Sequence, residues 1–134
     1  MPATDFLDSN VVIYSYATDQ AKKSRALDLL AGSPTISTQV INETVSVLRR
    51  KQLMPVEQIA TAIDDLTAWC HVFLVDISTI KQALDLAARY RLSYFDALMV
   101  AAAIGSGCTT LYSEDMHHGL VVDGVVTIQN PFQI

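Results

Sequence analysis

Cysteine is scarce in this sequence, which contains Cys70, Cys108 and no CxxC pair. Both cysteines lie near apolar residues, so we expect two buried, reduced thiols with neither a disulfide nor a metal role. No set of histidines and cysteines has the spacing of zinc ligands. The adjacent residues His117 and His118 have side chains that point apart, so we expect them on a loop surface.

Long hydrophobic runs are also missing. The longest covers residues 97–104, far short of the roughly 18 apolar residues that indicate a membrane span. The first five residues lack a basic segment followed by an apolar one, so we expect no signal peptide and a cytoplasmic location. Neither a glycine-rich phosphate loop nor the GxSxG elbow of hydrolases is found.

Basic residues are few, because 9 Lys and Arg stand against 14 Asp and Glu, for a net charge of −5. Alone, this balance disfavours a nucleic-acid partner, since contacts to phosphate need Lys and Arg. The objection weakens if several acids belong to one metal site. The basic residues also gather in three short groups: Lys22, Lys23 and Arg25; Arg49, Arg50 and Lys51; and Arg89 and Arg91.

The length and the apolar content both suit one compact domain over residues 1–134. The chain has 134 residues, of which 51% are hydrophobic, so it is not a disordered chain. A domain of this size buries roughly two-thirds of its unfolded surface. It therefore needs no disulfide or structural metal to remain folded.

Short β-like runs alternate with helical patterns along the chain. The expected strands are 5–8, 35–37, 71–75, 109–112 and 125–128, the last entered through an Asp123-Gly124 turn. The first four expected helices are 9–16, 21–30, 39–51 and 55–69, and Pro55 lies in the first turn of the last of these. A fifth helix is capped by Ser78 and reaches residue 90, and a sixth is opened by Ser93 and ends near residue 105. This alternation predicts an α/β fold, a three-layer sandwich whose mainly parallel central sheet is flanked by helices.

One acid stands out because it lies in an apolar helix. Asp96 is the one charged residue in the stretch 95–104, and an ionised carboxylate there is costly unless something pairs with it. The alternative is a capping box, in which Ser93 is the N-cap and Asp96 bonds back to it. The two roles are compatible. Most other acids on the predicted helices fall on polar, solvated faces.

Two further acids lie beside apolar residues. Glu43 shares a helical face with Val40 and Val47, so it is either a site residue or a boundary glutamate with its head in water. Asp8 follows a predicted strand directly, where it is either a site residue or the N-cap of the next helix. Sites on open α/β sheets lie beyond the carboxyl ends of the strands, which is where Asp8 falls.

Asp115 completes the set of four acids, with its neighbour Glu114 as a competitor for the same place. Either of the two could instead be a surface loop acid. Four acids at one edge of a sheet repel one another unless a cation is their partner. Mg²⁺ prefers carboxylate oxygens and accepts phosphate oxygens as further ligands, so the set predicts a metal site that acts on phosphate.

The acids also lie in blocks that resemble a known family. In order, the blocks are DSNVVIY at 8–14, TQVINE at 38–43, YFDAL at 94–98, SEDM at 113–116 with Gly119, and NPF at 130–132. Together they resemble PIN-domain ribonucleases, in particular the VapC-type toxins of type II toxin–antitoxin systems. No single block is specific, but their order and spacing cover essentially the whole chain.

The resemblance implies endonucleolytic cleavage of RNA that depends on Mg²⁺ or Mn²⁺. It implies that the metal ligands and catalytic residues are Asp8, Glu43, Asp96 and Asp115, with Ser113 as a supporting polar residue. It also implies a homodimer and a small antitoxin protein as partner. We expect the phosphate contacts from basic residues that flank the helices of Glu43 and Asp96, namely Arg49, Arg50, Lys51 and Arg91; ordinary solvated charge is the alternative.

Two other functions stay open. One is a Mg²⁺-dependent phosphatase or phosphotransfer domain with Asp8 as the nucleophile. It would want a DxD pair and a lysine after a later strand, whereas Asn10 stands where the second Asp of the pair would lie and no lysine follows Lys81. The other is a non-catalytic interaction module that keeps a PIN-like fold, since a fold does not determine a function. Loss of one of the four acids would favour it, and all four are present.

Overall fold

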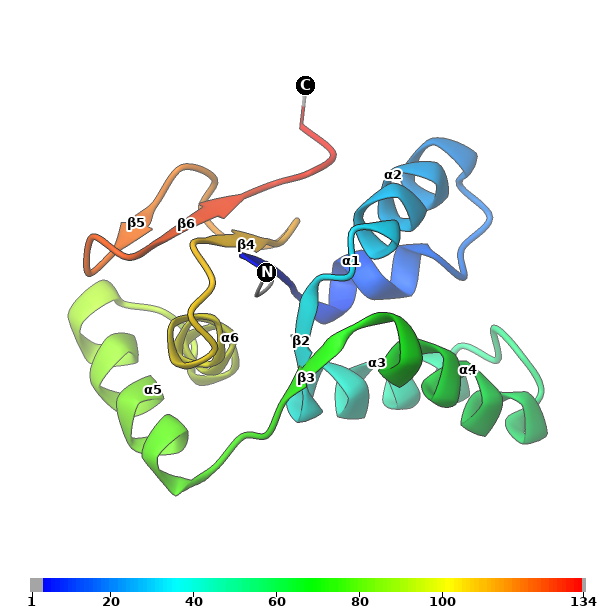
Figure 1. The fold of residues 1–134 in the computed structure, drawn as a ribbon, viewed down its shortest axis with the longest axis horizontal. Coiled ribbons are helices and arrows are strands. Elements are labelled where there is room, and N and C mark those ends of the chain that lie inside the picture. The colour runs from blue at the N-terminus through cyan, green and yellow to red at the C-terminus, as the bar shows by residue number, and fades with distance from the viewer. Residues whose placement is uncertain (1–3, 134) are drawn as a thin grey trace.

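The computed structural model describes residues 4–133 (Figure 1). Its strands are β1 (Asp5–Leu7), β2 (Thr35–Ser37), β3 (His71–Phe73), β4 (Thr110–Tyr112), β5 (Val121–Val122) and β6 (Val126–Gln129). Its helices are α1 (Ser9–Tyr14), α2 (Gln20–Ala31), α3 (Thr38–Arg50), α4 (Val56–Trp69), α5 (Ile77–Tyr90) and α6 (Tyr94–Gly105). Within this range no helix combines the length and the apolar character that crossing a membrane requires.

The strands form one sheet in the order β3-β2-β1-β4-β6-β5, parallel except for the β5–β6 pair. The chain moves outward from β1 to β3 and then returns across the sheet to β4. Because such crossovers are right-handed, the outward helices α1–α4 cover one face, and α5 and α6 cover the other (Figure 1). The predicted three-layer α/β sandwich is confirmed, and the strand order reverses between β1 and β4.

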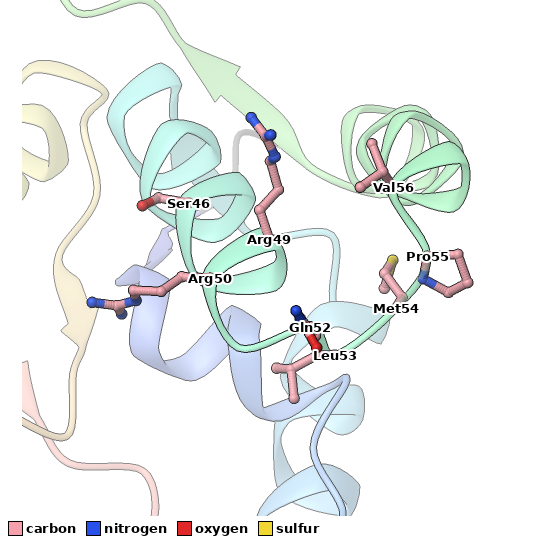
Figure 2. Close-up of a pocket in the computed structure, with 8 residues that line it drawn as sticks. All are labelled: Ser46, Arg49, Arg50, Gln52, Leu53, Met54, Pro55 and Val56. Carbon is pink, nitrogen blue, oxygen red and sulfur yellow. The ribbon is translucent and has the colours of Figure 1, made fainter.

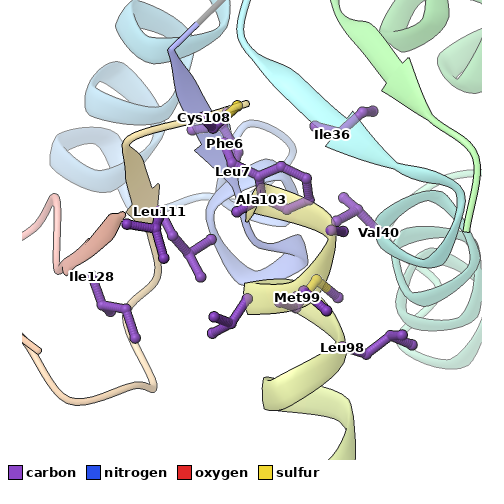
Figure 3. Close-up of a cluster of buried hydrophobic side chains, with 14 of the residues drawn as sticks. Phe6, Leu7, Ile36, Val40, Leu98, Met99, Ala103, Cys108, Leu111 and Ile128 are labelled. Carbon is purple, nitrogen blue, oxygen red and sulfur yellow. The ribbon is translucent and has the colours of Figure 1, made fainter. Parts of the chain in front are cut away.

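The core lies between the sheet and α6. Phe6, Leu111 and Ile128 are in register on β1, β4 and β6, and all three are fully buried. They lie on the side of the sheet where α6 presents Met99 and Ala103 (Figure 3). Each large apolar side chain buried in this way stabilises the fold by roughly 1.5–3 kcal/mol. Residues 97–103 of α6 are all buried, as expected for a helix that is apolar all round.

The two cysteines behave as the sequence predicts. Cys70 and Cys108 are both buried and form no disulfide. Burial raises the pKa of the Cys70 thiol to about 11. The thiol is therefore protonated at neutral pH and a poor metal ligand.

Two helix starts differ from the prediction. Asp76, and not Ser78, caps α5: its Oδ1 accepts the Thr79 N–H at 2.9 Å and the Thr79 hydroxyl at 2.8 Å. Aspartate and serine are about equally good N-caps, so the local sequence does not select between Asp76 and Ser78. Pro55 is the N-cap of α4 with an extended ψ of 145°, one residue before the first turn in which it was expected.

The strands differ at two places as well. β3 ends at Phe73, because the Val75 N–H donates to Thr38 Oγ1 at 3.1 Å and not to a neighbouring strand. β5 was missed by the sequence analysis. The Asp123-Gly124 turn, with φ values of 52° and 67°, joins β5 to β6 as an antiparallel hairpin. The predicted turn is thus confirmed, but it follows a strand of two residues that no pattern reveals.

Candidate active site

The ends of β1 and β4 lie side by side at the carboxyl edge of the sheet. Leu7 pairs with Tyr112, so the next residues, Asp8 and Ser113, are neighbours. The Asp8 N–H donates to the Tyr112 carbonyl at 2.9 Å, and Ser113 Oγ donates to Asp8 Oδ2 at 2.9 Å. Both residues are buried. The topology therefore holds the Asp8 carboxylate against a hydroxyl from a strand that lies a hundred residues away in sequence.

Asp8 is also the N-cap of α1. Its backbone is extended (φ −71°, ψ 159°), and its Oδ1 accepts the Ser9 N–H at 2.6 Å. The capping role considered for this residue is confirmed, and it leaves Oδ2 facing Ser113. Asp8 thus has a fixed orientation at the point where the strand order reverses, which is where α/β sheets bind their ligands.

Glu43 reaches the same place from α3. Ser9 Oγ donates to Glu43 Oε1 at 2.8 Å and lies 3.3 Å from Asp8 Oδ1. Gln39 Nε2, one turn earlier on α3, donates to Glu43 Oε2 at 3.2 Å. Glu43 is half-buried at the margin of the apolar face of α3, as its position between Val40 and Val47 indicates. Ser9 therefore joins two of the four acids.

Asn10 joins the carboxyl edge to Asp115. Its Nδ2 lies 3.2 Å from Asp115 Oδ2, 3.3 Å from Ser113 Oγ and 3.4 Å from Asp8 Oδ2. Its Oδ1 accepts the Glu114 N–H at 3.1 Å, which holds the loop that follows β4. Asp115 itself is exposed. The amide thus lies between a buried and an exposed carboxylate.

Asp96 approaches from α6, in its first turn. Ser93 is the N-cap, and its Oγ accepts the Asp96 N–H at 3.2 Å, which confirms the Ser93 half of the proposed capping box. The Asp96 side chain is half-buried. Its negative charge is close enough to raise the pKa of Asp8. The cap and the position near the other acids therefore coexist.

The Asp8 carboxyl group is strongly perturbed. Burial is the largest cause and raises its pKa from 3.8 to about 6. Hydrogen bonds from Ser113 and from the Ser9 N–H oppose this rise, whereas the charges of Glu43 and Asp96 add to it. Three of the predicted acids thus share one electrostatic environment, and Asn10 links the fourth to it. A perturbed carboxyl group in such a setting is typical of functional sites.

The four acids do not form a finished metal cage. Among residues 4–133, no three Asp, Glu, His or Cys side chains are grouped so that they could hold an ion as they stand. The physical reason is that Ser9 and Asn10 hydrogen-bond between carboxylates that would otherwise repel one another. The donors are hard oxygens, one of them buried and with a raised pKa, so their chemistry fits a Mg²⁺ or Mn²⁺ ion.

Glu114 has other partners. It lies 2.6 Å from Lys22 Nζ and accepts the Tyr14 hydroxyl at 2.6 Å. Partial burial raises the pKa of Glu114, but these hydrogen bonds outweigh burial and the net pKa is lowered. Lys22 Nζ also lies 4.6 Å from the centre of the Tyr14 ring and 5.5 Å from that of Phe132. Of the two adjacent acids, the contacts therefore favour Asp115 as the one available to a ligand.

A pocket of about 340 Å³ borders this edge. It is lined by Ser9, Asn10, Ile13, Tyr14, Val47, Lys51, Glu114 and Asp115. A larger hollow of about 820 Å³ lies where α3 gives way to α4, with Arg49 and Arg50 on its wall (Figure 2). Among the predicted phosphate-binding residues, Lys51 thus lines the same pocket as Asp115, and the two arginines line the larger hollow.

The remaining candidates lie on the surface. Arg91 is exposed and ends α5 in the left-handed conformation, with φ 57°. His117 and His118 are exposed as expected, and His118 Nδ1 accepts the Asn130 N–H at 2.9 Å. The sequence analysis did not foresee the joining roles of Ser9 and Asn10 or the pairing of Lys22 with Glu114. The small polar pair after Asp8 was the one signal for the first two.

Comparison with known proteins identifies the fold. A model of the PIN domain matches residues 6–119. VapC20 of Mycobacterium tuberculosis, a sarcin–ricin loop cleaving toxin, is 23% identical with a TM-score of 0.65, over 80% of this chain and 86% of that protein. A toxin–antitoxin complex from Klebsiella pneumoniae is 16% identical with a TM-score of 0.72, over 97% and 99% of the two chains. VapBC2 from Rickettsia felis, bound to a fragment of its promoter DNA, is 18% identical with a TM-score of 0.61, over 83% and 86%. No curated protein sequence matches significantly.

Proposed function

This chain belongs to the PIN domain family, and from that premise we propose that it is a metal-dependent endoribonuclease, the toxin of a toxin–antitoxin pair. Its substrate is RNA, and the bond it hydrolyses is a phosphodiester. The neighbours support this reading, because one is an RNA-loop-cleaving toxin and another a toxin–antitoxin complex. A homodimer and a cytoplasmic location complete the proposal.

One observation carries the proposal: a buried carboxylate is surrounded by other carboxylates. Asp8 is 5% exposed, and its pKa is raised chiefly by this burial and further by the charges of Glu43 and Asp96. None of the ion pairs formed among residues 4–133 includes these acids or Asp115. Uncompensated negative charge of this kind is costly and is relieved when a divalent cation binds.

We assign the metal to Asp8, Glu43, Asp96 and Asp115. A bound Mg²⁺ or Mn²⁺ ion supplies charge neutralisation at the phosphate and a water of lowered pKa. The protein's part is to hold the donors. Ser113 Oγ and the Ser9 N–H fix the Asp8 carboxylate, and Ser9 Oγ holds Glu43 against it. Asp115 is exposed and lines the pocket, so it lies on the side from which RNA enters.

The test is cleavage of a mixed RNA pool by the purified, antitoxin-free protein. The reactions contain Mg²⁺, Mn²⁺ or EDTA, with Asp96→Asn as the variant and Asp64→Asn as the control. Asp64 is an exposed acid on α4 with no part in the site. Cleavage that requires metal, falls on the order of 10²-fold or more in Asp96→Asn and persists in Asp64→Asn supports the proposal.

Other results contradict it. Cleavage that survives both EDTA and Asp96→Asn excludes the acidic metal mechanism. A folded protein that neither cuts RNA nor binds Mn²⁺ in calorimetry is a non-catalytic interaction module. Release of phosphate from small phosphate esters without cleavage of RNA would instead favour the phosphatase alternative.

A further inference from the structure

The C-terminal end of α3 carries three successive cations on an otherwise acidic protein, with a net charge of −5. We propose that Arg50 and Lys51, but not Arg49, form a phosphate-binding arm that holds the RNA strand next to the bond being cut. This inference rests on the proposed nuclease function. It divides three adjacent basic residues into two that contact substrate and one that does not.

Arg50 lies on the face of α3 that is turned toward the site. Glu43, Val47 and Arg50 follow one another at i, i+4 and i+7, so they lie on one side of α3. That side is turned toward the site, because Glu43 Oε1 accepts the Ser9 hydroxyl at 2.8 Å. Seven residues of helix span roughly 10 Å. Arg50 therefore lies about two turns from a proposed metal ligand and on the same side of the helix.

Lys51 lies at the pocket that borders the site. Val47 and Lys51 line the same pocket of about 340 Å³ as Asn10 and Asp115. The other acid of this pocket, Glu114, is paired with Lys22. An RNA strand that places one phosphate beside Asp115 passes the side of the pocket that Lys51 lines. The Lys51 ammonium takes part in no ion pair among residues 4–133, so it is available to a phosphate.

Arg49 and Arg50 both lie in the last turn of α3. Both line the hollow of about 820 Å³, but their side chains leave α3 in different directions (Figure 2). Successive helical residues are about 100° apart around the axis. Arg50 lies on the side of Ser46, one turn before it, and Arg49 points elsewhere (Figure 2). We therefore expect an RNA strand that passes Asp115 and Lys51 to continue toward Arg50.

The helix dipole does not account for the proposed difference between Arg49 and Arg50. Basic residues in the last turn of a helix complement its dipole. Arg49 and Arg50 both occupy that turn, and both are exposed. The dipole therefore favours them equally, and their difference lies in the face of α3 from which each one projects. Arg49 is thus a matched control within the same turn.

The test measures RNA binding without cleavage. The full chain with Asp96→Asn, in Mg²⁺, is titrated with a labelled single-stranded RNA oligonucleotide over a series of KCl concentrations. Arg50→Ala and Lys51→Ala should each reduce the slope of log K against log [salt] by about 0.7, the value for one lost contact to a single-stranded phosphate. Arg49→Ala should leave the slope unchanged, and Arg50→Lys should retain it.

Two kinds of outcome overturn the inference. If Arg49→Ala reduces the slope as much as Arg50→Ala, the effect is that of general charge at the helix end. If neither Arg50→Ala nor Lys51→Ala changes the slope, or the Asp96→Asn protein binds no RNA, the arm does not exist. Since all three side chains are exposed, circular dichroism should show the same folded state in each variant.

Failure of the arm and failure of the nuclease are distinguishable. The arm alone is refuted if the wild-type protein cleaves RNA with metal, but Arg50→Ala and Lys51→Ala leave the slope of log K against log [salt] unchanged. A wild-type protein that does not cleave, while the slopes change as expected, refutes the nuclease and leaves an RNA-binding surface. In a cleaving enzyme, Arg50→Ala should raise KM more than it lowers kcat, since it removes a phosphate contact that holds the RNA equally in the ground state and in the transition state.

Discussion

Asp8 combines structural and electrostatic demands that oppose each other. As the N-cap of α1 and the acceptor of the Ser113 hydroxyl, it makes contacts that favour its charged form. Burial and the nearby charges of Glu43 and Asp96 favour its neutral form more strongly, and raise its pKa to about 6. In the metal-free protein this residue is therefore a source of instability at neutral pH.

The first prediction is that Asp8→Asn stabilises the metal-free protein at pH 7. With a folded pKa of about 6 against an ordinary 3.8, the neutral Asp8 contributes stability at low pH that is lost as the pH rises from about 4 to about 6. The shift corresponds to about 3 kcal/mol at roughly 1.36 kcal/mol per pH unit. Urea unfolding in EDTA at several pH values measures the difference between variant and wild type, which should grow over that interval and then stay level.

Asp64→Asn is the control for this experiment, because Asp64 is exposed. It should change the free energy of unfolding little, and equally at every pH. A difference between Asp8→Asn and wild type that does not change between pH 4 and pH 7 would mean that burial does not perturb Asp8.

Lys22 forms an ion pair with Glu114, whereas the four acids of the candidate site have no such partner among residues 4–133. The second prediction is that Lys22→Met lowers the melting temperature by a few degrees at pH 7. The methionine keeps an apolar stem near the rings of Tyr14 and Phe132, but Glu114 loses its cation. Because the net pKa of Glu114 is lowered, its pairing stabilises the protein above about pH 4.5 and the benefit is lost as the pH falls.

The measurement is thermal unfolding by circular dichroism at pH 7 and pH 3. The loss in Lys22→Met should be smaller at pH 3 than at pH 7, because the benefit of the pairing is lost as the pH falls through the lowered pKa of Glu114. Lys23→Met is the matched control, since its ammonium has no ion pair among the residues that the structure describes. An equal loss at both pH values would assign the effect to packing of the Lys22 stem.

At the level of elements, predictability followed the strength of the local pattern. Helix α6 was placed correctly, because its apolar run and its Ser93 cap are both local signals. Strand β5 was missed, because two residues carry no periodicity and its pairing depends on a hairpin. The start of α5 was misplaced, because Asp76 and Ser78 are both acceptable caps and tertiary position selects between them.

In the candidate site too, features with a local sequence signal were predicted, and features that depend on tertiary packing were not. The approach of the four acids to the carboxyl edge was predicted, because Asp8 and Asp115 follow strands, and Glu43 and Asp96 lie in helices whose starts are readable. The bonds of Ser9 to Glu43 and of Asn10 to Asp115 were not, since they join residues 34 and 105 positions apart. Such contacts depend on how α1, α3 and the loop after β4 pack, and no local pattern encodes that packing.

Small residues on α6 allow the third prediction. Ala102 is fully buried in the middle of this helix, and α5 packs closely along it. Ala102→Leu should destabilise the protein by about 1–3 kcal/mol, because extra methylenes in a packed core force backbone or rotamer shifts. Ala88→Leu, at an exposed position on α5, should change stability by less than about 0.5 kcal/mol.

Chemical denaturation of the two leucine variants makes the comparison. Equal, small effects would mean that the core around Ala102 has room for a larger side chain. A loss in Ala102→Leu with an unchanged m-value would place the effect in the native state.

For the whole molecule, topology brings dispersed acids to one place. The order β3-β2-β1-β4-β6-β5 sets β1 beside β4, so Asp8 and Asp115 follow neighbouring strands. Glu43 comes from the helix after β2, and Asp96 from the helix before β4. The α/β fold thus concentrates negative charge at the edge where the strand order reverses. A cation that binds there would offset the repulsion and stabilise the entire domain.

The last prediction follows from this coupling of metal to folding. A ligand that binds only the native state stabilises it by about 2.7 kcal/mol at a hundred times its dissociation constant. Mn²⁺ should therefore raise the melting temperature of the wild type and of Asp64→Asn, EDTA should reverse the rise, and Asp96→Asn should show a smaller one.

The rise should also depend on pH in a defined direction. The pKa of metal-free Asp8 is about 6, so at pH 5 Mn²⁺ must displace a proton that is mostly absent at pH 7.5. At a fixed Mn²⁺ concentration, the increase in melting temperature should be smaller at pH 5 than at pH 7.5 in the wild type. In Asp8→Asn this dependence should be weaker, because the competing proton is gone. Equal increases at both pH values in the wild type would exclude Asp8 from the metal ligands, even if the protein cleaves RNA.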